Sequence, residues 1–271
     1  MKTFCHSGDL GDLVFSLPTI RALTPKGEQA ELYLVPDNRC RQPFTLPHAY
    51  NIGTLLMQQP YIRRWSIGAP ENIKFDYDFR EWRTAYDGHS NLAYSQAKHF
   101  GVDPSVADEP WLTVEQPVTC RPAGMSTLPA VVVCRSHRYR QHDFPWNEIA
   151  DRYRDSAIVI GTRSEAEELR YLYGFNNYAE TSTLLDAARI IAGADLVISN
   201  ATCSYAIAEG LKKTVLFERW PVYTNVDFDR PGVYTGERVM QYLTNAPAKV
   251  VAAPVAAPKI SGTRRPEAAA V

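Results

Sequence analysis

The sequence lacks a long apolar run. No window approaches the roughly 18 consecutive apolar residues that a membrane-spanning helix needs. The N-terminus carries a single Lys2 and no long apolar stretch behind it. We therefore expect no integral membrane segment, and we predict a cytoplasmic protein.

Cysteine is scarce and scattered. The five cysteines show no C-x-x-C spacing and are odd in number: Cys5, Cys40, Cys120, Cys134 and Cys203. A disulfide framework is therefore not expected, and a reducing compartment fits best. The histidines show no ligand spacing with nearby acids or cysteines, so we predict no metal site.

An excess of charge of one sign is also absent. Lys and Arg number 29 and Asp and Glu 30, which gives a formal net charge of -1 at pH 7. No global basic field is available to hold a polyanion, although a local groove can be basic in a neutral protein. Of the 271 residues, 45% are hydrophobic and 22% are charged, which is ordinary globular usage and predicts a sizeable core.

Strand and helix signals alternate along the first part of the chain. Short apolar runs predict strands at 1–7, 31–35, 63–67 and 75–79, and apolar residues at helical spacing predict helices at 13–23, 50–58 and 91–100. Pro18 lies inside the first helical run, which predicts a kink there or a later helix start. Strands that alternate with helices indicate crossover units and a mainly parallel sheet.

The same alternation restarts after a Pro-rich segment at 117–129, which we interpret as a linker. Beyond it, strands are predicted at 130–134, 157–160, 195–199 and 214–217, and helices at 146–154, 164–173, 183–192 and 203–211. Ser164 is the expected N-cap of the second of these helices. We predict an N-terminal domain at 1–116, a C-terminal domain at 130–245 and a disordered Ala/Pro-rich tail at 246–271.

Three motifs follow one another in a recognisable order. The first is Gly8-Asp9-Leu10-Gly11-Asp12 with the helix after it, and the second is the strand at 131–135 with the basic stretch up to Trp146. The third covers 184–190, 194–198 and the turn into the helix at 205–211. Together they resemble the heptosyltransferases, family nine of the glycosyltransferases. The resemblance implies two facing Rossmann-like α/β domains of the GT-B type, with the acceptor on the first domain and a nucleotide-sugar donor mainly on the second.

Sugar transfer needs a base for the acceptor proton and positive potential for the departing diphosphate. Gly8 and Gly11 let the chain turn tightly after the first strand and approach a ligand closely. Asp12 then stands at the carboxyl end of a strand, where open α/β sheets bind ligands. By resemblance Asp12 is the general base. Alternatively Asp12 only caps the helix, and Asp9 is the second candidate for the base.

A basic run follows the first strand of the second domain. It reads Arg135-Ser-His-Arg-Tyr-Arg-Gln-His142 and contains three arginines. Guanidinium groups match phosphate oxygens in fork geometry. The resemblance places a cation here against the donor phosphate, and Arg138 or Arg140 is the first candidate, followed by Arg135. The alternative is a solvated basic loop.

The turn at 200–204 is a second candidate for phosphate binding. It consists of Asn200, Ala201, Thr202, Cys203 and Ser204 and leads into a helix, whose first backbone N–H groups bind anions. The hydroxyls of Thr202 and Ser204 add donors or, alternatively, only cap the helix.

Two further residues are candidates for contact with the nucleoside. Glu209 lies farther along the same helix, and in related folds an acid there holds a ribose; the alternative is solvated surface. Thr162 follows another strand and either touches the nucleotide or belongs to an ordinary β-to-α turn. The family has an acidic residue and a His where this chain has Asn200 and Tyr205, so the donor's identity stays open.

We predict an inverting, metal-independent glycosyltransferase that needs no cofactor and uses a nucleotide-sugar as donor substrate. The acceptor stays open among a glycan, a lipid-linked saccharide and a modified DNA base. The DNA alternative calls for a basic stripe on the first domain, for which six arginines are available: Arg39, Arg41, Arg63, Arg64, Arg80 and Arg83. A third alternative is a nucleotide-sugar-binding module without catalytic activity.

Overall fold

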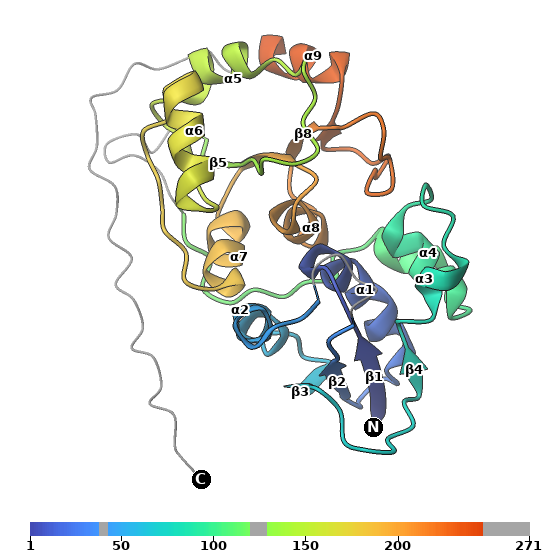
Figure 1. Ribbon diagram of the computed structural model, residues 1–271. Coiled ribbons are helices and arrows are strands. Elements are labelled where there is room, and N and C mark those ends of the chain that lie inside the picture. The colour runs from blue at the N-terminus through green and yellow to red at the C-terminus, as the bar shows by residue number, and fades with distance from the viewer. Residues whose placement is uncertain (38–42, 120–128, 246–271) are drawn as a thin grey trace.

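The chain folds into two parallel β-sheets with helices packed on them (Figure 1). The computed structural model describes residues 1–37, 43–119 and 129–245. One sheet precedes the expected linker at 117–129 and the other follows it. The predicted disordered tail and most of that linker lie outside the described residues. The predicted α/β fold with two mainly parallel sheets is confirmed.

The first sheet has the strand order β3-β2-β1-β4, and every pair is parallel. Its strands are β1 Lys2–His6, β2 Ala30–Leu34, β3 Ile62–Ile67 and β4 Tyr77–Asp78. The helices of this half are α1 Leu10–Leu23, α2 Leu46–Leu56, α3 Trp82–Ala85 and α4 Leu92–His99, followed by a 3₁₀ turn at Pro104–Ala107. Parallel neighbours require crossover connections, and α1 and α2 supply the first two.

The second sheet has the order β6-β5-β7-β8-β9 and is also parallel throughout. Its strands are β5 Val131–Cys134, β6 Ile158–Val159, β7 Leu196–Asn200, β8 Val215–Glu218 and β9 Val233–Tyr234. Its helices are α5 Trp146–Tyr153, α6 Arg163–Tyr173, α7 Leu184–Ala192, α8 Cys203–Gly210 and α9 Glu237–Asn245. The sequence did not predict β9 and α9.

Helix α1 begins earlier than predicted and passes through Pro18. Gly8, with φ 91°, turns the chain out of β1, and the helix starts directly afterwards at Leu10. We expected Pro18 to kink the helix or to delay its start. The expectation of a later start was wrong. Residues 13–20 of α1 are all buried, so tertiary packing outweighs the hydrogen bond that proline cannot donate.

Helix α6 also begins earlier than predicted. Its N-cap is Thr162, whose hydroxyl accepts from the backbone N–H of Glu165, and the Glu165 carboxylate accepts from the N–H of Thr162 in return. This reciprocal pair is a capping box. The expectation that Ser164 caps this helix was therefore wrong, because Ser164 is already inside its first turn.

One buried cluster spans both halves, and a second belongs to the second half alone. Alternate residues of β5 point to opposite faces: Val131 and Val133 pack against α5 and α9, whereas Val132 and Cys134 join a cluster that also contains Phe4 and other side chains of the first sheet. Helices α1 and α8 pack on each other, as do α2 and α7, between the two sheets (Figure 1). The carboxyl ends of both sets of strands therefore face a common region.

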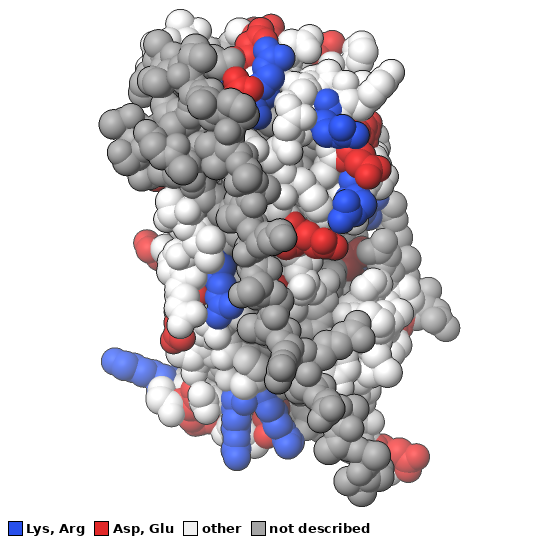
Figure 2. Space-filling model, turned by 90° about the vertical axis from the view of Figure 1, so that its left-hand side faces the viewer, with Lys and Arg blue, Asp and Glu red and all other residues white. Residues whose placement is uncertain are grey.

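The surface carries both signs of charge. On the face shown in Figure 2, Lys and Arg side chains are interspersed with Asp and Glu. In the part of the chain that the structure describes, no helix has both the length and the apolar character needed to cross a membrane.

Candidate functional site

A cavity of about 460 Å³ lies where the two halves meet. It is formed by the first turns of α1 and α8, by the segments that follow β5 and β8, and by the start of α4. These are connections at the carboxyl ends of parallel strands, where open α/β folds place their ligands. Six of the predicted site residues line it: Asp9, Gly11, Asp12, Arg138, Thr202 and Cys203.

Asp12 is the most constrained carboxylate of this cavity. Its Oδ2 accepts a hydrogen bond from Nη2 of Arg83 at 2.6 Å, and its side chain is only 16% exposed. Burial raises the pKa of the Asp12 carboxyl, while the nearby guanidiniums of Arg83 and Arg138 act to lower it. The N-cap of α1 is Asp9, so the capping alternative for Asp12 does not hold. A raised pKa brings a carboxylate closer to the range in which a general base works best.

Asp9 occupies the N-cap position of α1, yet its side chain accepts no capping hydrogen bond. Its Oδ1 is buried and has no partner among the described residues. A buried acceptor without a partner is uncommon in folded proteins and calls for an explanation, such as a ligand or an ordered water. Asp9 thus has a polar atom beside the cavity that the fold itself does not use.

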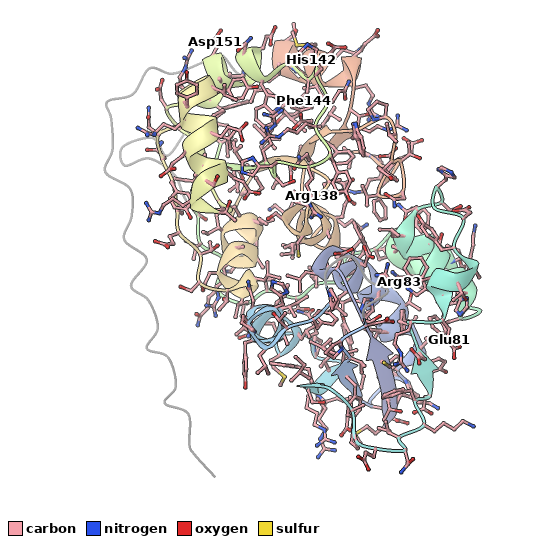
Figure 3. The ribbon with its side chains drawn as sticks, viewed as in Figure 1. Glu81, Arg83, Arg138, His142, Phe144 and Asp151 are labelled. Atoms are coloured by element: carbon pink, nitrogen blue, oxygen red, sulfur yellow. The ribbon has the colours of Figure 1, made fainter. Side chains whose placement is uncertain are left out.

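Arg138 is the cation of the cavity. Within the described residues no carboxylate forms an ion pair with it, and its guanidinium lies over the ring of Tyr139 at 5.3 Å. Figure 3 shows Arg138 beside α8 and Arg83 beside α1 and α3. Arg138 is therefore available to an anionic ligand.

Asn200 fixes the backbone that carries Arg138. It is fully buried at the end of β7, and its amide N–H₂ donates to the carbonyls of Ser136 at 3.1 Å and Arg138 at 2.5 Å. Its Oδ1 accepts from the N–H of Ser136 at 2.9 Å. Asn200 was predicted to be part of a phosphate-binding turn, but the structure uses its side chain to hold the neighbouring loop, outside the cavity lining.

The other two arginines of the basic run point elsewhere. Arg135 is 7% exposed and forms two hydrogen bonds of 2.7 Å to the buried carboxylate of Glu218. Arg140 binds both oxygens of Glu168, at 2.6 and 2.7 Å. Neither lines the cavity, and each guanidinium is paired with a carboxylate that becomes its neighbour only on folding. Of the three predicted phosphate ligands, the structure brings only Arg138 to the site.

The turn into α8 reaches the cavity with two of its residues. Thr202 is the N-cap of α8, where its hydroxyl accepts from the N–H of Tyr205 at 3.2 Å. Cys203 follows, and burial raises the pKa of its thiol to about 12, so it stays protonated. Ser204 interacts with the thiol of Cys134 and does not line the cavity.

Glu209 and Tyr205 make contacts within the protein that hold α8 in place. Glu209 is fully buried and accepts two hydrogen bonds of 2.9 Å from Arg230, so no ribose is needed to satisfy it. Tyr205 is also fully buried, stacks on Phe217, and donates its hydroxyl to the carbonyl of Val226 at 3.1 Å. Because Val226 lines the cavity, Tyr205 shapes the site from behind.

Thr162 does not line the cavity, and neither do the described arginines of the expected basic stripe. Thr162 is exposed and its hydroxyl is engaged in the capping box of α6. Among the six arginines considered for a basic stripe, Arg64 pairs with Glu31, Arg80 with Asp78 and Arg83 with Asp12. Arg39 and Arg41 lie outside the described residues. The paired arginines therefore do not form a continuous basic surface.

The sequence did not predict the aromatic side of the cavity. Tyr139 and Tyr223 line it and contact each other and Trp220. Tyr139 adopts φ 55°, a conformation that is rare for an aromatic residue and that occurs preferentially at functional sites. Tyr223 is on an irregular segment after β8, where no periodicity signals its position. In the sequence, only the position of Tyr139 next to Arg138 indicates that an aromatic side chain lies at the site.

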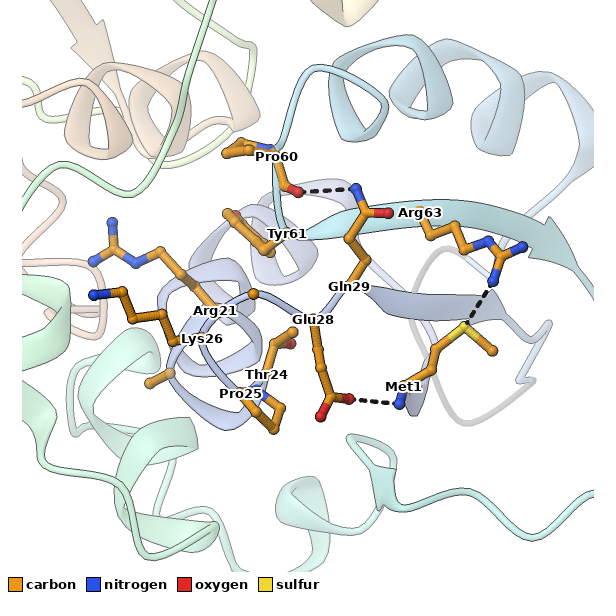
Figure 4. A pocket seen from close by; sticks show the side chains of 12 residues that line it. Met1, Arg21, Thr24, Pro25, Lys26, Glu28, Gln29, Pro60, Tyr61 and Arg63 are labelled. Atoms are coloured by element: carbon orange, nitrogen blue, oxygen red, sulfur yellow. Dashed lines mark hydrogen bonds and ion pairs between the residues drawn. The ribbon is translucent and has the colours of Figure 1, made fainter.

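A larger hollow, of about 900 Å³, lies at the opposite end of the first sheet, where β1 and β3 begin (Figure 4). Its charged groups are largely used within the protein. The N-terminal amine pairs with Glu28, and Arg21 donates to the carbonyls of Pro110 and Val106. The smaller cavity between the halves is therefore the better candidate site. No group of three or more His, Cys, Asp or Glu is placed to hold a metal ion in the described part of the chain.

Similarity to known proteins lies in the fold rather than the sequence. No protein-family model matches the chain, and no curated protein matches it. The E. coli heptosyltransferase WaaC, solved with ADP-2-deoxy-2-fluoro heptose, aligns over 89% of this chain and 98% of its own with a TM-score of 0.52 and 12% identity. A family 9 glycosyltransferase from Veillonella parvula aligns over 88% and 86%, with a TM-score of 0.55 and 9% identity. This chain has the heptosyltransferase fold.

A third structure extends the comparison. TibC of enterotoxigenic E. coli, described as an iron-containing dodecameric glycosyltransferase, has a TM-score of 0.52 and 16% identity over 85% of this chain. This chain spans 61% of the length of TibC. The GT-B-like arrangement expected from the sequence motifs is thus found in the fold, and the cavity lies between its two halves.

Proposed function

We propose that the protein is a glycosyltransferase that moves a sugar from a nucleotide-sugar to an acceptor hydroxyl. One observation carries the proposal: Asp12 from the first half and Arg138 from the second line the same cavity, at the carboxyl ends of both sheets. A base on one wall and a cation on the other are the two groups that sugar transfer requires.

Asp12 accepts the proton of the acceptor hydroxyl in this mechanism. The acceptor oxygen forms a bond to the anomeric carbon while the bond from that carbon to the nucleoside diphosphate breaks. Arg138 and the backbone N–H groups at the start of α8 stabilise the negative charge of the departing diphosphate. A single displacement of this kind inverts the configuration at the anomeric carbon. Because Asp12 belongs to the first half and Arg138 to the second, the acceptor binds mainly to the first half and the nucleotide-sugar mainly to the second.

We propose further that the reaction needs no metal ion. Arg138 and the N-terminal end of α8 provide positive potential where a divalent cation acts in other sugar transferases. Transfer should therefore persist in EDTA at millimolar concentration. Loss of transfer that manganese, magnesium or iron restores would contradict this part of the proposal and leave the rest standing.

A panel of donors tests the activity itself. Thermal shifts with ADP-, UDP-, GDP- and CMP-linked sugars identify the nucleotide, and release of the free nucleotide then reports transfer or slow hydrolysis. The expected outcome is stabilisation by one nucleotide class and nucleotide release that Asp12→Asn abolishes. Binding without release under any condition would favour the non-catalytic module, and no binding at all would overturn the proposal.

A further inference from the structure

Arg83 makes the direct ion pair with Asp12. It lies on α3, the short helix between the first sheet and α4, and its Nη2 is 2.6 Å from Oδ2 of Asp12. Its guanidinium lies over the Trp82 ring at 5.3 Å, and its side chain is 28% exposed. Arg83 does not line the cavity, so it reaches the site only through Asp12. In the described residues, Oδ1 of Asp12 receives no hydrogen bond.

We propose that Arg83 is a positioning residue for the base: it holds one oxygen of Asp12 and leaves the other directed to the acceptor hydroxyl. The inference rests on the proposed function, because it takes Asp12 to be the base. A guanidinium that binds one carboxylate oxygen fixes the rotamer of the side chain. It also keeps the carboxylate ionised in a site whose burial favours the neutral acid.

The groups around Asp12 make this role measurable. The charged neighbours are Arg83, Arg138 and Asp9. Three other titratable groups face it: burial raises the pKa values of Cys203 and Tyr86 to about 12 and lowers that of His6 to about 3. These three stay uncharged between about pH 5 and 9. A titration of Asp12 in that range is therefore not confused by a change of charge on any of them.

The experiment compares Arg83→Met with a matched control, Arg80→Met. Arg80 lies in the same segment, also pairs with an Asp, Asp78, and is 30% exposed, close to the 28% of Arg83. Carboxyl ¹³C NMR of Asp-labelled protein follows the titration, and Asp12→Asn assigns the resonance. Loss of an opposite charge at this distance should raise the pKa of Asp12 by about 1–3 units in Arg83→Met. Arg80→Met should leave the pKa of Asp12 unchanged.

Activity supplies the second measurement. In Arg83→Met the acidic limb of the kcat profile should move to higher pH by the same amount, while the Kd of the nucleotide stays constant because Arg83 does not touch the cavity. Arg83→Lys keeps the charge and should recover part of both the pKa and the turnover. A pair that only stabilises the fold predicts a loss of Tm in Arg83→Met, with a kcat profile whose acidic limb does not follow the titration of Asp12.

An Asp12 pKa in Arg83→Met that equals that of Arg80→Met overturns the inference. If Arg83→Met does not fold, Arg83→Lys replaces it. The pKa of Asp12 should then rise by a smaller amount, and an unchanged pKa of Asp12 again overturns the inference. The titration needs no substrate. A parent protein that transfers no sugar therefore refutes the proposed function, while the titration alone decides whether Arg83 controls Asp12.

Discussion

Asp12, the proposed base, is largely buried, and its pKa is raised. A group whose folded-state pKa lies above its unfolded value adds stability below the unfolded pKa and loses that contribution as the pH rises through the folded pKa. Above its folded pKa, ionised Asp12 is therefore a net cost to the fold. Residues that lower stability in this way are common at functional sites.

Asp12→Asn separates catalysis from folding. The amide keeps the shape of the side chain but cannot accept a proton, so turnover should fall by about 10²–10⁴-fold. Because a costly buried charge disappears, Tm at neutral pH should stay level or rise. Nucleotide affinity should hold, since the nucleotide is expected at Arg138. Turnover within about threefold of the parent would reject Asp12 as the base and direct the same test to Asp9.

Arg138→Met tests the anion site, with Arg140→Met as its control. A charge-assisted hydrogen bond is worth about 1.5–3 kcal/mol, so nucleoside-diphosphate affinity should fall at least tenfold in Arg138→Met by calorimetry. Arg140 is held by Glu168 and does not line the cavity, so its replacement should change affinity by less than about threefold. Equal losses in both variants would show that the basic run acts through its overall charge.

The sequence identified which residue types gather at the site but not which of them are free. Asp12 and Arg138 were predictable from their places after the first strand of each half. Arg135 and Arg140 look equivalent to Arg138 in the sequence, but their partners Glu218 and Glu168 lie 83 and 28 residues away along the chain. Long-range pairing of this kind leaves no local pattern, and the link between Arg83 and Asp12 was missed for the same reason.

At the scale of elements, α8 positions two parts of the cavity that belong to the second half. Its N-terminus lines the cavity, and Tyr205 on its first turn holds the segment that contains Val226. Most of the helices and strands were predictable because their apolar periodicity is strong. Strand β9 was missed because it has two residues, and α1 was placed too late because Pro18 outweighed the packing signal.

Tyr205→Phe tests whether α8 shapes the cavity through this hydrogen bond. Loss of the bond to the carbonyl of Val226 should lower the free energy of unfolding by about 0.5–1.5 kcal/mol and should also weaken nucleotide binding. Tyr61→Phe is the control, because its hydroxyl donates to the carbonyl of Trp111 at 3.2 Å and neither residue lines the cavity. It should lose similar stability, measured by urea denaturation, with unchanged nucleotide affinity. Identical affinity in both variants would make Tyr205 a purely structural residue.

At the scale of the whole molecule, the two sheets are joined by a common buried cluster, beside the one that belongs to the second sheet alone. One buried cluster includes Phe4 and Leu32 of the first half together with Val132 and Val197 of the second. The segment before the linker adds to this, since the backbone N–H groups of Trp111 and Leu112 donate to the carbonyl of Gly210. A Cβ on Gly210 would lie 2.6 Å from the side chain of Leu112, so this contact depends on a glycine.

Unfolding should therefore be a single transition. Circular dichroism and the fluorescence of Trp82 and Trp146, which are buried in different halves, should report the same midpoint in urea. Two separated transitions, or a calorimetric enthalpy well above the van't Hoff value, would show that the halves unfold independently.

The shared core also determines where a bound nucleotide is detected. Ligand at 100 times its Kd adds about 2.7 kcal/mol to the free energy of unfolding of everything that unfolds together. Backbone amides of β2 are buried in the first half and lie outside the cavity lining. If their hydrogen exchange requires global opening, a nucleotide held at Arg138 slows it by about a hundredfold, as much as it slows exchange in β5. The amides of Leu32 and Tyr33 then become reporters of a ligand that they never touch.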